Sequence, residues 1–146
     1  RYRLWRTWDA GKPPLAMLML NPSIADESQN DPTVERCQRR AVAGGFGGLE
    51  VVNIFALVST DPAALYTVDD PVGTDNDSAI LDVVGKAGMV LCGWGTHGRH
   101  AGRAKDVVEL LRGAGVTPYC LGVNADGSPK HPLYVGYSVT PTPYSL

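Results

Sequence analysis

The apolar and polar positions along the chain predict short strands that alternate with amphipathic helices. Tyr, Leu and Trp are interspersed with arginines over residues 1–8, which predicts a first strand, and a continuous apolar run over Leu15–Leu20 predicts a second. Continuous apolar runs are typical of strands that are covered on both faces, as in parallel sheets. The same pattern predicts further buried strands at 49–56, 88–95 and 116–123.

Helices are expected between these strands. Asp31 and Pro32 are typical of a helix start, with Asp31 as the N-cap, and the glycine-rich segment 44–48 would end that helix. Other helices are expected to begin within 59–65, to run over 76–87, and to run over 101–115 with Gly113 or Gly115 as the stop. Strands alternating with helices predict one α/β domain over residues 1–146, with a mostly parallel, four-stranded central sheet. The proline-rich tail is expected to be irregular.

Polar residues follow the expected ends of the four buried strands. They are Asn21 and Ser23, then Asn53, then Trp94 with Thr96 and His97, and finally the loop 124–131. Ligands of parallel sheets bind beyond the carboxyl ends of the strands. The four strand ends are therefore expected to converge on one rim that carries the functional site.

The composition is that of an ordinary globular protein, with 44% hydrophobic and 19% charged residues. The formal net charge of −2 argues against non-specific nucleic-acid binding by the whole surface but leaves room for a local basic patch. No apolar run reaches the ~18 residues that span a bilayer, so no membrane partner is expected. Cys37, Cys92 and Cys120 have no zinc spacing, and we expect buried, reduced thiols in a cytoplasmic protein.

The motifs of several enzyme classes are missing from the chain. It has no Walker loop, no GxGxxG that opens a helix and no GxSxG. His97 and His100 have no partner set at metal-ligand spacing, so no metal site is predicted. The expected rim instead offers amides, hydroxyls and imidazoles. An amide presents a donor and an acceptor side by side, which suits the edge of a nucleobase.

Four segments, in order, resemble motifs of the uracil-DNA glycosylase superfamily. LNPS (20–23) resembles the first motif, closest to the Asn-Pro form of the mismatch-specific and single-strand-selective branches. VVNIFA (51–56) resembles the strand whose final Asn reads uracil, and VLCGWGTHG (90–98) resembles the strand that ends in a Trp-Gly or Leu-Gly turn. KHPLY (130–134) resembles the His-Pro loop with its DNA wedge. The whole sequence also resembles a bacterial and phage family of unknown function.

The resemblance implies a three-layer α/β/α sandwich and a DNA glycosylase. Such an enzyme hydrolyses the N-glycosidic bond of uracil or a modified pyrimidine after flipping the base into a pocket. By similarity, Asn21 would position the attacking water, His131 would donate a hydrogen bond to the base oxygen that gains charge, and Asn53 would read the base edge. The base pocket would also be lined by Pro22, Ser23 and Trp94. This chemistry needs no metal or organic cofactor.

The resemblance further implies DNA as the partner. Leu133 and Tyr134 would fill the space left in the base stack. Arg99, Arg103 and Lys105 would hold phosphates, although the same basic cluster also fits a solvated helix face. A monomer is the expected state.

The chain departs from the family pattern near the first motif. Residues 24–36 hold no aromatic on which a base would stack, and Phe46, Phe55 and Trp94 are the alternatives. Asp26 is an extra carboxylate, which would act as the base in a variant mechanism or remain a solvated charge.

Two other functions stay open. One is a nucleobase or nucleic-acid binding module that keeps the pocket without the chemistry. The other is a hydrolase or transferase of free nucleosides, which needs no DNA groove and fits the negative net charge.

Overall fold

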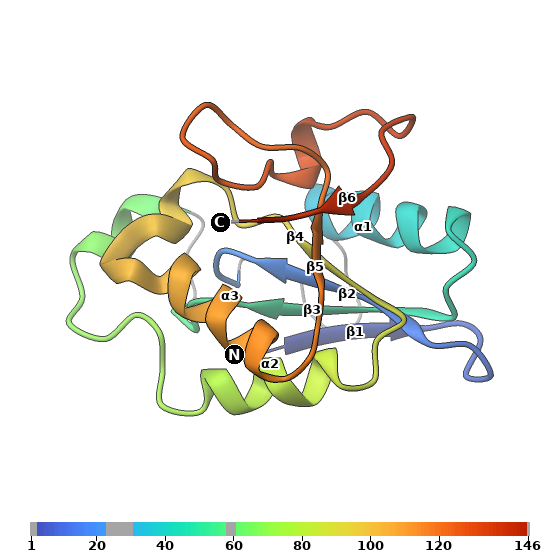
Figure 1. Ribbon diagram of the computed structural model, residues 1–146, viewed down its shortest axis with the longest axis horizontal. Coiled ribbons are helices and arrows are strands. Elements are labelled where there is room, and N and C mark those ends of the chain that lie inside the picture. The colour runs from blue at the N-terminus through green and yellow to red at the C-terminus, as the bar shows by residue number, and fades with distance from the viewer. Residues whose placement is uncertain (1–2, 23–30, 58–60, 146) are drawn as a thin grey trace.

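The computed structural model describes residues 3–22, 31–57 and 61–145, and within them a single six-stranded sheet runs through the centre (Figure 1). Its order is β1-β3-β2-β4-β5-β6. The strands are β1 (Arg3–Thr7), β2 (Pro14–Met19), β3 (Gly48–Asn53), β4 (Met89–Cys92), β5 (Pro118–Cys120) and β6 (Thr142–Pro143). The four central strands run parallel, and both edge strands run antiparallel to their neighbours.

The mixed α/β class is therefore as predicted, but the sheet has six strands rather than four. The strand expected at 1–8 pairs with β3 at one edge. At the other edge the tail forms β6, where we expected irregular chain. Tyr144 explains this pairing, because its backbone N–H donates to the Pro118 carbonyl (2.8 Å) and its buried ring packs edge-on against Trp94.

Three α-helices are seen in the described residues: α1 (Pro32–Ala43), α2 (Asn76–Val84) and α3 (Arg103–Gly113). The predicted start of α1 is confirmed, because the Asp31 side chain accepts a hydrogen bond from the Val34 N–H (2.8 Å). Three short 3-10 helices, η1 (Pro62–Tyr66), η2 (Thr96–Gly102) and η3 (Pro132–Tyr134), connect the main elements. The helix expected to begin within 59–65 is the short η1. No helix in the described ranges is long and apolar enough to cross a membrane.

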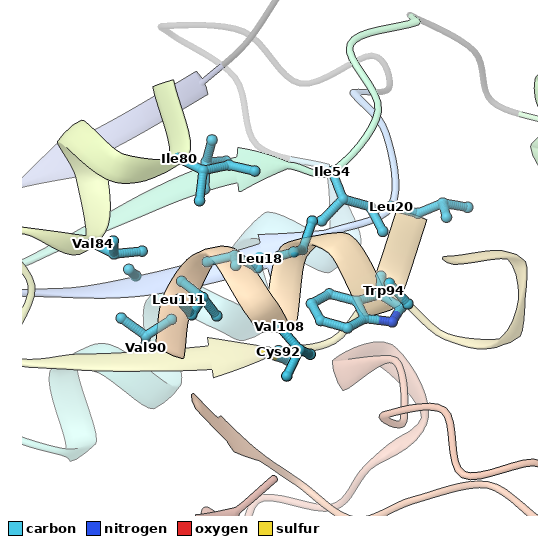
Figure 2. Close-up of a cluster of buried hydrophobic side chains, with 14 of the residues drawn as sticks. Leu18, Leu20, Ile54, Ile80, Val84, Val90, Cys92, Trp94, Val108 and Leu111 are labelled. Atoms are coloured by element: carbon cyan, nitrogen blue, oxygen red, sulfur yellow. The ribbon is translucent and has the colours of Figure 1, made fainter. Parts of the chain in front are cut away.

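The helices cover both faces of the sheet. Along β2 and just beyond it, the even positions Ala16, Leu18 and Leu20 pack in a cluster with α2 and α3, which is drawn in Figure 2. The odd positions Leu15, Met17 and Met19 pack in a second cluster with α1. Successive strand residues face opposite sides of a sheet, so a continuous apolar run serves two cores.

The three cysteines are free and buried, in agreement with the expected thiols. Burial raises the pKa of Cys37 to about 12 and also raises the pKa of Cys92. A thiol that stays protonated at neutral pH is a poor nucleophile, so Cys37 and Cys92 serve packing.

Candidate functional site

A cavity of about 740 Å³ lies at the carboxyl ends of the parallel strands, within the size range of small-molecule sites. Of the predicted site residues, its lining includes Asn21, Pro22, Asn53, Trp94, His131, Leu133 and Tyr134. Two others, Ser23 and Asp26, lie outside the described residues. The structure thus gathers residues from four distant segments at one rim.

Asn21 and Asn53 belong to neighbouring strand ends. Met19 pairs with Asn53 in the β2–β3 register, and the N–H groups of Ile54 and Phe55 continue the pairing to the Met19 and Leu20 carbonyls at 2.9 Å. The Asn21 side-chain Nδ2 donates to the Leu57 carbonyl (3.1 Å), which orients its amide at the rim. Two amides are thereby held on adjacent strands.

Asn53 is buried, with 4% of its surface exposed, and it lines the cavity. Its amide presents a donor and an acceptor side by side, which a bound ligand with complementary groups would pair. Asn53 is thus the lining residue best suited to read a ligand edge.

His131 enters the cavity from the loop after β5. Its Nδ1 accepts a hydrogen bond from the Leu133 N–H (3.2 Å), so the neutral ring carries its proton on Nε2. Burial lowers the pKa of His131, while the carboxylate of Asp31 partly opposes this effect. The imidazole is therefore a neutral hydrogen-bond donor at neutral pH.

Gly93 allows this loop to approach the end of β4. A Cβ at Gly93 would lie 2.9 Å from the Pro132 Cδ and 3.3 Å from the Met19 Sδ, so any other residue there would force Pro132 or the strand to shift. The loop is also tied down by backbone hydrogen bonds from Gly95 N–H to the Pro129 carbonyl (3.0 Å) and from Lys130 N–H to the Gly122 carbonyl (2.9 Å).

Stability should depend on pH through His131. Because its pKa is lowered from 6.5 in the folded state, the unfolded chain binds the proton more readily. The contribution of His131 is present above about pH 6.5 and is lost as the pH falls through the folded pKa. Urea unfolding at about pH 5 and pH 7.5 should show this loss, and the loss should be smaller in His131→Gln. An equal loss of stability in His131→Gln would mean that His131 is not the group responsible.

Asn124, on the cavity wall next to His131's loop, was not among the predicted site residues. Its Nδ2 donates to the Ser128 hydroxyl (3.0 Å), and that hydroxyl donates to Asp126 Oδ1 (2.5 Å). Hydrogen bonds from the Ser128 side chain and backbone lower the pKa of Asp126, which keeps this carboxylate an acceptor. The chain of donors fixes the orientation of the Asn124 amide. The only sequence signal was its place after a strand.

Asp31 is a second lining residue that the sequence indicated only as a helix cap. Its carboxylate acts on His131 across the cavity rim. Tyr134 lies on the same rim with 84% of its surface exposed, beside the half-buried Leu133. An exposed aromatic at a pocket mouth is suited to contact a ligand that extends beyond the pocket.

The predicted phosphate-binding cluster does not line the cavity. Arg103 is only 5% exposed, and its guanidinium binds Asp77 (2.7 Å) and the Ile54 carbonyl (2.7 Å). Arg99 lies 3.7 Å from Asp126, and Lys105 is exposed. Arg103 is thus engaged within the fold and is not presented to a phosphate.

Of the three aromatics considered for stacking, Trp94 is the one that lines the cavity. Phe55 is fully buried, and Phe46 packs near Gly44 and Gly88 at the amino ends of the strands. Trp94 is itself 1% exposed and closes one end of the cluster in Figure 2. It therefore forms part of the cavity wall and the core at once.

Gly98→Ala should destabilise the protein through Trp94. A Cβ at Gly98 would lie 2.1 Å from Trp94 Cδ1, so the ring or the backbone of η2 must move. Overpacking of this kind costs about 1–3 kcal/mol, measurable by urea unfolding. Gly113→Ala is the matched control, because nothing lies within 4 Å of that position in α3. Equal stability of the two variants would contradict the tight contact.

The cavity offers neutral hydrogen-bonding groups above an apolar floor, and two charged side chains, Asp31 and Lys130, also belong to its lining. In the part of the chain that the structure describes, no three His, Cys, Asp or Glu side chains gather as metal ligands. The amides of Asn21, Asn53 and Asn124, with the Nε2–H of His131, suit a planar ligand rich in donors and acceptors.

Fold and cavity together define a mixed α/β protein with a ligand-sized pocket at the carboxyl ends of its parallel strands. The sequence profile described as "Protein of unknown function (DUF1643)" matches residues 1–133, and the chain belongs to this family. The expected likeness to a family of unknown function is thereby confirmed. No curated protein and no solved structure matches the chain significantly, and the glycosylase resemblance stays a prediction.

Proposed function

We propose that the protein is a DNA glycosylase that releases uracil or a modified pyrimidine by hydrolysing its N-glycosidic bond. The observation that supports the proposal is that Asn21, Asn53 and His131, the three residues to which the resemblance assigns roles, line one cavity. A uracil-DNA glycosylase-like arrangement of the α/β layers belongs to the same proposal.

The roles follow from the chemistry of each group. In the reaction a water oxygen bonds to C1′ of the sugar while the bond from C1′ to the base nitrogen breaks, and the electron pair leaves with the base. The proton that the water loses ends on the released base, so the products are the sugar hydroxyl and the neutral base. Asn21 would hold the water through its amide oxygen, which can accept two hydrogen bonds. His131 would donate from Nε2 to the base oxygen that gains the negative charge.

Recognition of the base would fall to Asn53. Its amide offers a donor and an acceptor in one plane, which complements the O4 acceptor and N3–H donor of uracil. Leu133 and Tyr134 at the rim would occupy the space that the flipped base leaves in the stack.

The test is a strand-cleavage assay on labelled oligonucleotides that carry uracil, hydroxymethyluracil, hypoxanthine or a mismatched thymine. Alkali converts abasic sites into strand breaks. We expect breaks with at least one substrate, and we expect Asn21→Ala to lose them while Arg39→Ala, on the exposed face of α1, keeps them. Absence of product on every substrate from the folded protein would refute the proposal.

A free-nucleoside hydrolase or transferase is the second candidate, and the burial of Arg103 favours it. The Arg103 guanidinium pairs with Asp77, and Arg99 lies near Asp126. Two of the three predicted phosphate-binding side chains are therefore next to carboxylates. Salt distinguishes the two functions. Binding to DNA should weaken steeply between 50 and 200 mM salt, roughly in proportion to the phosphates contacted, whereas nucleoside binding should hardly change.

A further inference from the structure

Two arginines of α1 hold the segment that follows His131. Arg36 donates from Nε to the Pro132 carbonyl (3.2 Å) and from Nη2 to the Val135 carbonyl (2.6 Å). Arg40, one turn later, donates to the carbonyls of Val135 (3.1 Å), Gly136 (2.8 Å) and Val139 (3.0 Å). Two side chains thus bind four carbonyls across almost a hundred residues of sequence.

The ring of Tyr137 completes this arrangement. The Arg36 guanidinium lies 4.3 Å from its centroid and that of Arg40 lies 5.5 Å away, both within cation–π range. Like charges one helix turn apart destabilise a helix, and here the carbonyl oxygens and the aromatic face offset that cost. Arg39 is a useful contrast, because it is exposed and, among the described residues, pairs with Glu35 on its own helix.

The arrangement bears directly on His131. Pro132, whose carbonyl Arg36 binds, is the next residue, and the Leu133 N–H that fixes the imidazole tautomer lies between the two bound carbonyls. Pro132 is also packed against the end of β4 at Gly93. The imidazole is therefore held between the sheet and α1, and α1 supplies the charged hydrogen bonds.

We propose that Arg36 and Arg40 are positioning residues that set the place of the His131 imidazole in the cavity by clamping the backbone of residues 132–139. Their charged donors form stronger and more directional bonds than neutral ones, and Arg36 reaches its two carbonyls through two separate nitrogens. The catalytic consequence rests on the proposed function, whereas the placement of the ring does not.

The first test is the NMR spectrum of the His131 ring, assigned by the signals that vanish in His131→Gln. We expect Arg36→Ala to shift these signals while the signals of His97 and His100 stay in place, and Arg39→Ala to shift none. Arg36→Lys keeps the positive charge but loses the pair of guanidinium donors, and it should shift the His131 signals by a smaller amount. If Arg36→Ala does not fold, the shift of the His131 signals in Arg36→Lys is the test. Unshifted His131 signals in a folded Arg36 variant overturn the proposal.

The second test is kinetic and separates the clamp from the function. If the wild type releases a base, Arg36→Ala should lower kcat by up to about 100-fold, the loss expected for a misplacement near 1 Å, with KM nearly unchanged. An unchanged kcat in folded Arg36→Ala would overturn the clamp's catalytic role. A wild type that is inactive on every substrate refutes the proposed function. The NMR signals of the His131 ring then remain as the only test of whether Arg36 and Arg40 position that ring.

Discussion

Replacement of His131 by alanine is expected to lower kcat for base release by about 100- to 1,000-fold, the usual loss when one donor to a developing anion is removed. The reason is the tautomer: Nδ1 is occupied by the Leu133 N–H, so the ring donates from Nε2 in its neutral form. Because burial lowers the pKa of His131, this neutral form persists to pH values below the ordinary titration of histidine. The measurement is single-turnover cleavage of the preferred oligonucleotide.

His131→Gln and Lys86→Ala complete this experiment. Glutamine retains an N–H donor, so it should recover part of the rate if donation is the role of His131. Lys86 pairs with Asp82 on the surface of α2, and its replacement should leave the rate unchanged. Full activity of folded His131→Ala, or no difference between the alanine and glutamine variants, would exclude the role.

The sequence predicted the strand ends because burial on both sides leaves a clear pattern. Every residue of Leu15–Leu20 packs against one helical layer or the other, so the run is uninterrupted until Asn21. Since parallel strands end at one edge, the sequence alone predicts that Asn21, Asn53 and His131 lie together. The edge strand β6 escaped prediction because two residues, one of them proline, carry no periodic signal.

The burial of Arg103 could have been predicted from its helical spacing, although its place in a basic cluster suggested a phosphate contact. Arg103 lies four and eight positions before Val107 and Leu111, both buried, and so shares the buried face of α3. That spacing predicts a buried arginine, and a buried charge needs a partner, which the structure shows to be Asp77. Asp31 differs from Arg103, because the sequence indicates only a helix cap there and its place in the cavity depends on long-range packing. Asn124 follows an expected strand, which placed its loop at the rim but did not single out its side chain.

Asn53→Asp is expected to change which base is released. In uracil, O4 accepts and N3–H donates, which the amide of Asn53 can match, whereas cytosine presents a donor at N4. A carboxylate has no donor for uracil O4 but accepts from the cytosine amine. A paired contact of this kind is worth about 1–3 kcal/mol, so the uracil-to-cytosine rate ratio should fall by about 5- to 150-fold.

The ratio is the decisive quantity because it corrects for the cost of the substitution itself. Asn53 is 4% exposed, and a carboxylate there pays a desolvation penalty that lowers the rate with every base alike. Asn53→Ala removes donor and acceptor together, so it should slow both reactions without favouring cytosine. A ratio that stays constant in Asn53→Asp, measured on matched oligonucleotides, would mean that the base edge is read elsewhere in the cavity, and the oriented amide of Asn124 would be the next residue to replace.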